Sequence, residues 1–486
     1  MPTTQDRKGI ALLLLCMVQF MVVLDIAIVN VALPTIKNAL DFKETDLQWV
    51  INAYTLTFGG LLMLGGRAAD LLGRRRMFLA GLVLFSGASL VCGLSTSEGM
   101  LIAARAVQGV GAAIISPAAL SILMTTFSEG AERNKALGIW GAIAGTGGAA
   151  GVLLGGVLTD QLNWSWIFYI NVPVGALVIA LGPRYLRESR IETAGRRSFD
   201  LLGAVLVTGG LSLLVYALVQ TVDHSWTAPR TIAMFVGAAV LLGGFIFTEQ
   251  RAESPLMPLR LFRNRSLSGA NVVGLMLGAS IFSMFFLLTL YMQQVLGYSA
   301  LRTGIGYLLV ASVIIVSAAA SQALVTKIGV RTVLATGMAL TTAGLVYFSQ
   351  ISVGGSYLAD LAPGFILAGV GLGFSFVPVQ IASLIGVTHD EAGIASGLIN
   401  TSQQVGGALG VAVLSTITFT RYDSYLGDHG NNLALIPNAL VDGFHVAFLV
   451  GAGLALIGLV ATLLFIPKDV KSEQPAPAGE PAIDLS

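Results

Sequence analysis

Two charged residues lie inside apolar segments that are long enough to cross a lipid bilayer. Asp25 lies in a run from about Ile10 to Leu33, and Arg105 lies in another, with Gln108 three residues later on the same helical face. A carboxylate in the bilayer core costs about 2.5–3.5 kcal/mol on insertion scales. We therefore expect function to explain Asp25, either as a group that binds and releases a proton or as a partner for a cationic substrate. A helix-packing aspartate and an arginine that reaches toward the interface are the structural alternatives.

Other polar side chains inside apolar segments are candidates for lining a cavity. Asn400 and Gln404 are four residues apart and share a helical face. Hydrogen bonding between helices is the structural alternative. The predicted substrate-binding set is Asp25, Asn30, Tyr54, Gln108, Tyr291, Gln294, Phe376, Gln380, Asn400 and Gln404.

The composition predicts a membrane protein that crosses the bilayer many times. Of its 486 residues 55% are hydrophobic and 11% are charged, where a soluble protein carries about 25% charged residues. The two cysteines, Cys16 and Cys92, both lie in apolar runs and indicate no disulfide framework. We find no phosphate-binding loop, nucleophile elbow or metal-ligand spacing, and so predict no cofactor, no metal, no nucleic-acid partner and no enzyme activity.

The apolar segments predict fourteen membrane-spanning helices, because backbone groups in lipid must bond within their own segment. Most Lys and Arg residues fall in alternate loops, which predicts that both termini are cytoplasmic. The predicted spans are 10–33, 47–66, 76–95, 99–124, 134–158, 164–183, 200–220, 231–249, 267–294, 303–325, 331–350, 359–385, 394–420 and 444–466.

A weak internal repeat predicts how the spans are grouped. RAADLLGRRRMFLAG joins spans 2 and 3, and aligning Gly73 with Gly329 matches it to SQALVTKIGVRTVLATG between spans 10 and 11. Repeated six-helix halves are typical of secondary transporters. We predict a six-helix bundle over 1–190, two additional helices over 191–262, a second six-helix bundle over 263–467 and a disordered tail over 468–486.

The loop between spans 2 and 3 carries the most specific motif. It resembles the signature loop of the major facilitator superfamily, on Gly66, Asp70, Gly73 and Arg74. LDIAIVNVALP (24–34), LIAARAVQGVGAA (101–113), GTGGAAGVLLGG (145–156) and WSWIFYINVPVG (164–175) are similar to motifs of its fourteen-span drug:proton antiporters.

This resemblance implies roles for three groups of residues. Asp25 and Arg105 would couple transport to protons, and the loop would act as a conformational gate whose aspartate docks on the opposite half. The gate set is Gly66, Asp70, Gly73, Arg74 and Arg75. The antiporter motif would allow close helix packing at Gly147, Gly151, Gly155 and Gly156. A further hypothesis pairs Asp390 and Glu391 with the arginines at 74–76 when the halves meet.

Three functions are compatible with these observations. The first is a proton-coupled antiporter that exports amphipathic drugs or toxic small molecules by alternating access, as a monomer in the inner membrane of a bacterium. The second is a dedicated secondary transporter of one metabolite, siderophore, amino acid or lipid in the same fold. The third, a membrane sensor or scaffold without transport, is disfavoured because no segment is long enough for a soluble signalling domain.

Overall fold

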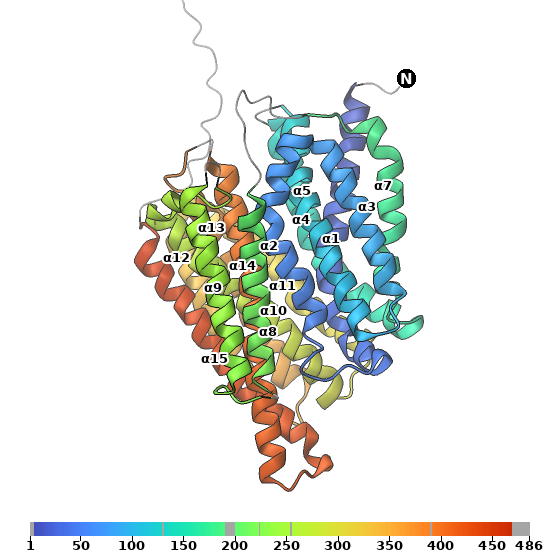
Figure 1. The fold of residues 1–486 in the computed structure, drawn as a ribbon, viewed down its shortest axis with the longest axis vertical. Coiled ribbons are helices and arrows are strands. Elements are labelled where there is room, and N and C mark those ends of the chain that lie inside the picture. Colours follow the sequence, from blue (N-terminus) through green and yellow to red (C-terminus); the bar gives the residue numbers. More distant parts are fainter. Residues whose placement is uncertain are drawn as a thin grey trace, which may run out of the picture.

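The computed structural model describes residues 4–128, 131–189, 200–222, 224–252, 255–388 and 391–468. Within these ranges the chain is helical and contains no strand (Figure 1). The long helices run roughly parallel to one another, and α1 to α7 lie beside α8 to α15. The predicted all-helical polytopic membrane fold is confirmed.

The first group of helices covers the segments in which most motifs were found. The bounds of its helices are α1 Thr4–Leu40, α2 Trp49–Leu72, α3 Arg74–Gly93, α4 Glu98–Thr126, α5 Ala131–Gln161, α6 Trp166–Tyr169 and α7 Asn171–Tyr185. The predicted span 164–183 is interrupted at Ile170, so that it forms the short α6 and then α7. This interruption places Asn171 at the first position of α7.

The remaining helices follow the predicted order. They are α8 Leu201–Gln220, α9 Pro229–Arg251, the short η1 Leu259–Arg263, α10 Arg265–Leu290 with η2 Tyr291–Val295, α11 Ala300–Ile328, α12 Val330–Phe348, η3 Tyr357–Leu361 with α13 Ala362–Leu384, α14 Ala392–Asp428, η5 Leu433–Leu435 and α15 Ile436–Phe465. Within the described residues, twelve helical segments are long and apolar enough to cross a membrane. The 31-residue α5 and the 37-residue α14 are also long enough, which fits the predicted count of fourteen.

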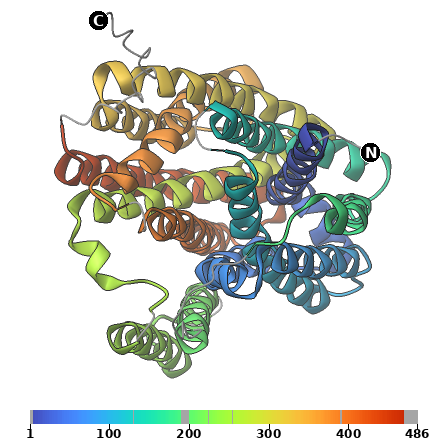
Figure 2. The ribbon, with the colours of Figure 1, turned by 90° about the horizontal axis from the view of Figure 1, so that it is seen from above.

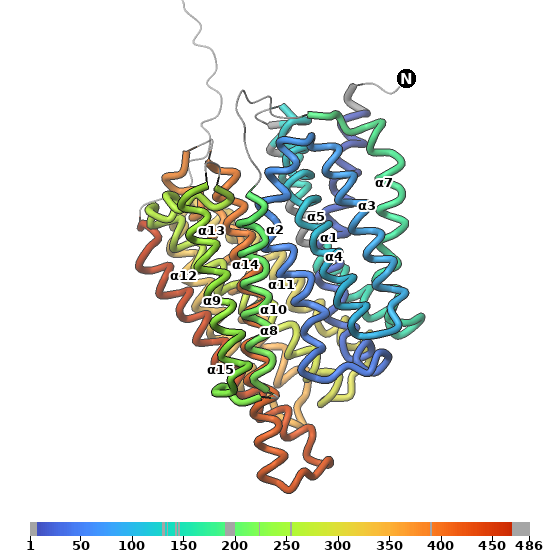
Figure 3. Tube along the Cα trace, viewed as in Figure 1, coloured from blue at the N-terminus to red at the C-terminus, as the bar shows by residue number. Residues whose placement is uncertain are grey.

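The turns that join α2 to α3 and α11 to α12 have the same backbone geometry. Gly73 has φ 111° and Gly329 has φ 85°, and each glycine is the single residue between two helices. Positive φ is unfavourable for residues with a Cβ atom, which explains a glycine at both turns. The two glycines that the sequence alignment paired therefore both form single-residue turns between helices. Figure 3 follows the Cα trace of the chain through α2, α3, α11 and α12.

The two groups of helices contact each other closely at the end of the molecule opposite the start of α1. Gly304 of α11 lies against Val152 of α5, so that a Cβ atom there would be 2.4 Å from the Val152 carbonyl oxygen. Gln293 Nε2 donates to the carbonyl oxygen of Val31 at 2.8 Å, and Leu301 N donates to Asp160 Oδ2 at 2.9 Å. We call this set of contacts, between α1 or α5 and the η2–α11 region, the far-end seal.

Helices α8 and α9 form a pair at the edge of the molecule (Figure 2). α8 packs against both α2 and α14, which belong to different groups. At the far end, α14 continues past the predicted limit at residue 420 to Asp428, and α15 begins at Ile436 rather than at 444. The end of α14 and the start of α15 therefore form a helical hairpin that projects beyond the other helices (Figure 1).

Candidate functional site

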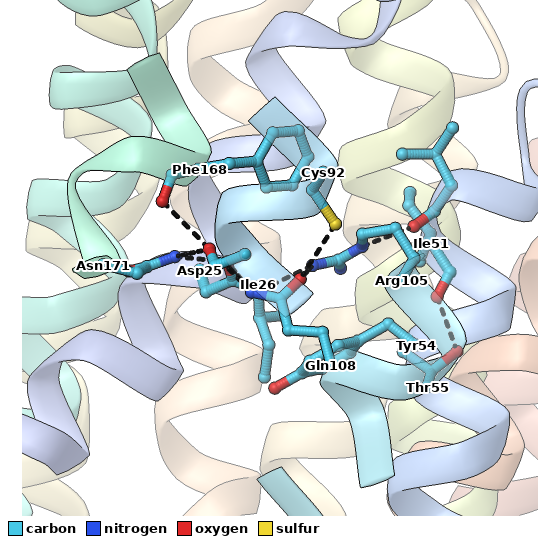
Figure 4. A network of polar contacts seen from close by, with 12 residues as sticks. Asp25, Ile26, Ile51, Tyr54, Thr55, Cys92, Arg105, Gln108, Phe168 and Asn171 are labelled. Carbon is cyan, nitrogen blue, oxygen red and sulfur yellow. Dashed lines mark hydrogen bonds and ion pairs between the residues drawn. The ribbon is translucent and has the colours of Figure 1, made fainter. Parts of the chain in front are cut away.

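Asp25 is placed among three other helices by the packing of α1. Gln108 and Arg105 lie one turn apart on α4, Ser89 lies on α3, and Asn171 begins α7. Figure 4 shows the side chains of Asp25, Arg105, Gln108 and Asn171 pointing toward one another. The site is therefore assembled by tertiary packing and not by any one sequence motif.

The Asp25 carboxylate accepts hydrogen bonds from three side chains. Arg105 Nη1 donates to Oδ2 at 2.7 Å, and both Gln108 Nε2 and Asn171 Nδ2 donate to Oδ1 at 2.8 Å (Figure 4). Asp25 is 0% exposed and Arg105 is 1% exposed. An ionised carboxylate requires such donors when it is removed from water.

The arginine is held by further contacts on its other sides. Arg105 Nε donates to the carbonyl oxygen of Val50 at 2.9 Å, and Nη1 also donates to Gln108 Oε1 at 2.7 Å. The Tyr54 ring centroid is 4.3 Å from Arg105 Cζ, and that of Phe168 is 5.8 Å away. Aromatic faces stabilise a desolvated cation. The guanidinium therefore has bonding partners besides Asp25.

Two members of the network were not predicted from the sequence. Asn171 Nδ2 also donates to Ser89 Oγ at 3.0 Å, and Ser89 Oγ donates to the carbonyl oxygen of Phe168 at 2.9 Å. Both residues are buried. The signal that could have indicated Asn171 is an amide beside Pro173 within an apolar segment, where it must find a partner.

The predicted substrate-binding residues are not gathered into one site in this structure. Asp25, Gln108 and Tyr54 belong to the buried network, and Asn30 Nδ2 bonds to its own helix at Ile26 O, 3.0 Å away. Tyr291 is fully buried and donates to Ser352 O at 2.7 Å, which makes it a packing contact near the far end.

The other predicted substrate-binding residues lie on three further segments. Gln294, in η2, donates from Nε2 to Glu44 Oε2 at 3.5 Å, and Glu44 lies in the loop between α1 and α2, beside the far-end seal. Phe376 and Gln380 are half-buried on α13. On α14, Asn400 is exposed, whereas Gln404 is 8% exposed with no hydrogen-bond partner for Nε2 in the described part of the chain.

The gate residues lie at the end of the molecule where α1 begins. Asp70 Oδ1 accepts hydrogen bonds from Arg74 Nε at 3.1 Å and Nη2 at 2.9 Å, within its own group of helices. The backbone amides of Arg75 and Arg76 donate to Glu188. Among the described residues, Asp70 thus pairs within its own group of helices, and its docking on the opposite half, which the resemblance implies, stays a prediction. The last gate glycine, Gly66, packs against Pro117 of α4.

Three of the four antiporter-motif glycines lie against α1. A Cβ atom added at Gly147, Gly151 or Gly155 would lie within 3.4 Å of atoms of Phe20 to Ile28. Gly156 instead faces α11, where a Cβ atom would be 2.7 Å from both Ala300 O and Leu301 Cα. These positions place α5 in close contact with the helix that carries Asp25.

Of the acidic loop that was hypothesised to pair with the arginines at 74–76, only Glu391 lies among the described residues, and it pairs elsewhere. Glu391 forms an ion pair with Arg260 at 2.9 Å, and Asp390 lies outside the described residues. Most of the predicted tail, from residue 469 onward, is also outside them. Within the described residues, no group of three or more His, Cys, Asp or Glu side chains is arranged to hold a metal.

A helical membrane bundle that carries a buried ion pair inside one group of helices is typical of secondary transporters. The chain belongs to the Major Facilitator Superfamily, which it matches over residues 15–411. The resemblance stated from the sequence motifs is thereby confirmed.

Relatives with known roles match almost the whole chain. The chain is 38% identical over 480 residues to a puromycin resistance protein of Streptomyces alboniger, covering 98% of this chain and 94% of the relative. It is 40% identical over 467 residues to a cephamycin export protein of Amycolatopsis lactamdurans, covering 96% and 94%.

Solved structures support the fold. A peptide transporter matches with a TM-score of 0.68 at 16% identity, covering 95% of this chain and 98% of that one. A bacterial homologue of the lysosomal transporter Spinster matches with a TM-score of 0.67 at 14% identity, covering 94% and 98%.

Proposed function

We propose that this protein exports amphipathic drugs or toxic small molecules across the inner membrane of a bacterium, in exchange for protons. Relatives over nearly the full length are a resistance protein and an export protein, which supports export as the direction. The protein would act as a monomer, with both termini in the cytoplasm. The 1–190 and 263–467 bundles would move relative to each other, with 191–262 as additional helices.

The observation that carries the proton-coupling proposal is the buried ion pair of Asp25 and Arg105. One charge that crosses 100 mV is worth about 2.3 kcal/mol, so an inward proton can drive an outward substrate. Protonation of Asp25 would remove the negative charge that holds Arg105 Nη1. Arg105 would keep Val50 O and Gln108 Oε1 as acceptors, which lets the pair separate without leaving the guanidinium unbonded.

The far-end seal supports a defined place for this structure in the transport cycle. With the termini in the cytoplasm, the far end faces outward, so the structure is closed to the outside. Asp25 is inaccessible in this state, and a substrate would first meet less buried polar groups such as Asn400. We assign to Asp25 the role of coupling acid, with any direct contact to substrate confined to another state.

The family relationship also supports a dedicated carrier as a second candidate. Two relatives are named for single compounds, puromycin and cephamycin, and another is a multidrug resistance protein of Mycobacterium tuberculosis at 36% identity. A narrow substrate profile would favour the dedicated carrier. A broad profile would favour multidrug export.

The first experiment is efflux of a fluorescent lipophilic cation from energised cells. Wild type is compared with Asp25→Asn at equal expression, with and without a protonophore, and Asp442→Asn serves as a control because it alters an ion pair in the projecting hairpin. We expect efflux to be lost with the protonophore and in Asp25→Asn, and to persist in the control.

Each other outcome has a defined meaning. Efflux that survives Asp25→Asn but not the protonophore would move the coupling role to another group. Efflux that survives the protonophore would refute proton coupling. Absence of efflux over a broad panel of dyes would favour the dedicated carrier.

A further inference from the structure

A second pair of buried carboxyl groups lies away from Asp25, at the end of the molecule where α1 begins. Asp200 precedes the first turn of α8, and Glu249 lies in the last turn of α9. The two residues are 8% and 4% exposed, respectively. Together they join the two ends of the α8–α9 hairpin, which the transport mechanism above does not use.

The hydrogen bonds of this pair leave one oxygen unused. Asp200 Oδ1 accepts from Gly203 N at 2.8 Å, and the two Glu249 oxygens accept from Leu256 N at 3.2 Å and Met257 N at 3.1 Å. The Asp200 side chain lies within hydrogen-bonding reach of Glu249. Yet Asp200 Oδ2 is buried and accepts no hydrogen bond from the described part of the chain.

The cations that the structure describes near this pair contact other groups. On α9, the Arg251 guanidinium lies 3.9 Å from the Phe247 ring centroid. On α2, Arg67 Nη1 donates to the Pro255 carbonyl oxygen at 3.5 Å, and in η1 Arg260 pairs with Glu391. Among the ion pairs of the described residues, none includes Asp200 or Glu249.

We propose that Asp200 and Glu249 form a second proton-binding site, which holds one proton between the two carboxyl groups. Two adjacent carboxylates that are removed from water repel each other, so ionising both is unfavourable. A single proton, taken up from water, turns one carboxyl group into a donor. It thereby supplies a partner for Asp200 Oδ2, which has none among the described residues.

The site is placed to control how the α8–α9 hairpin attaches to the rest of the protein. Leu256 and Met257, which Glu249 holds, line a groove of about 210 Å³ together with Gly59 of α2 and Val405 of α14. Loss of the proton would set two negative charges against each other and weaken the bonds to this segment. The groove lies where the hairpin meets helices of both groups, so the hairpin would loosen there.

The direct test is infrared spectroscopy of the full-length purified protein at neutral pH. Asp200→Asn is the principal variant, because its amide oxygen can still accept from Gly203 N while its NH₂ group replaces the shared proton. We expect the wild type to show a protonated-carboxyl band that is absent in Asp200→Asn and in Glu249→Gln. Glu132→Gln is the matched control, since hydrogen bonds from Lys8 and Ser128 lower the pKa of Glu132 to about 2 and keep it ionised.

Thermal unfolding against pH gives a second, independent result. The unfolded chain releases its carboxyl protons above about pH 4, whereas the folded pair keeps one. Wild-type stability should therefore fall as the pH rises, and Asp200→Asn should lack this component while Glu132→Gln retains it.

A wild type without the extra band, or with the same pH dependence as Asp200→Asn, would overturn the proposal and indicate that both carboxylates are ionised. If one variant fails to fold, the other carries the comparison. Neither measurement uses transport, so failure here is distinct from failure of the export proposal.

Discussion

The Asp25 carboxylate joins three helices, because its donors come from α4 and α7 while it lies on α1. Removing one partner of a buried ion pair typically costs about 3–5 kcal/mol, since the other charge is left uncompensated. The amide donors around Asp25 have a different role. They hold the carboxylate in position and reduce the cost of keeping it ionised away from water.

Asn171→Leu tests this positioning role. The substitution keeps the number of side-chain heavy atoms but removes the 2.8 Å bond to Asp25 and the 3.0 Å bond to Ser89. Hydrogen bonds to charged groups contribute about 1.5–3 kcal/mol, so we expect a loss of stability of about that size together with reduced efflux. Thermal unfolding and dye efflux measure the two effects.

The control for this prediction is Asn163→Leu, at an exposed loop position. It should leave both stability and efflux close to wild type. An Asn171→Leu protein as stable and active as wild type would show that Asp25 does not depend on this amide.

The sequence predicted the charged residues of the network but not its neutral ones. Asp25 and Arg105 are conspicuous because a charge in an apolar segment has a high cost. Asn171 and Ser89 have no such signal, since single amides and hydroxyls are common in membrane helices and bond locally or across helices. In the sequence Asn171 lies 146 residues from Asp25 and 82 residues from Ser89, so no local pattern reveals these contacts.

At the scale of the helices, the far-end seal depends on the absence of side chains. Gly304→Ala would place a Cβ atom 2.4 Å from the Val152 carbonyl oxygen, and backbone atoms cannot move aside without separating α5 from α11. We expect this variant to favour a state that is open at the far end. A cysteine at Gln293, which bonds across the seal, should then react faster with a membrane-impermeant maleimide.

Gly148→Ala is the matched control on α5, because a Cβ atom there meets nothing within 4 Å. The cysteine at Gln293 should react at the original rate in that background. Equal rates in the Gly304→Ala and Gly148→Ala proteins would show that close approach of α5 and α11 does not close this end.

The helices themselves were largely predictable because the bilayer fixes their length and polarity. The single-residue turns at Gly73 and Gly329 were also indicated by the aligned repeat. The break at Ile170 was not predicted, since the apolar pattern is continuous through it. Nor was the extension of α14 to Asp428, because that segment is polar and lies beyond the region in which hydropathy identifies helices.

At the scale of the whole molecule, proton coupling requires that protonation of a residue in one group of helices changes the arrangement of both groups of helices. Among the described residues, Asp25 is bonded within the first group, whereas α5 links that group to α11 through the far-end seal. Because α5 packs along α1 at Gly147, Gly151 and Gly155, movement of α1 after Asp25 is protonated would be passed to the seal. Protonation of Asp25 would thus act on the seal from a distance, and the movement of the loaded carrier need not itself require the charged pair.

The double variant Asp25→Asn/Arg105→Gln tests whether the loaded carrier moves without the charged pair. It removes both charges together, so that neither is left buried without its partner, and we expect it to be more stable than Asp25→Asn alone. In proteoliposomes it should still exchange labelled for unlabelled substrate, because exchange needs only the movement of the loaded carrier. It should fail to accumulate substrate when a pH gradient is imposed, whereas wild type should do both. Accumulation by the double variant would exclude Asp25 and Arg105 as the coupling groups, and loss of exchange in a stable double variant would show that the charged pair is required for the conformational change itself.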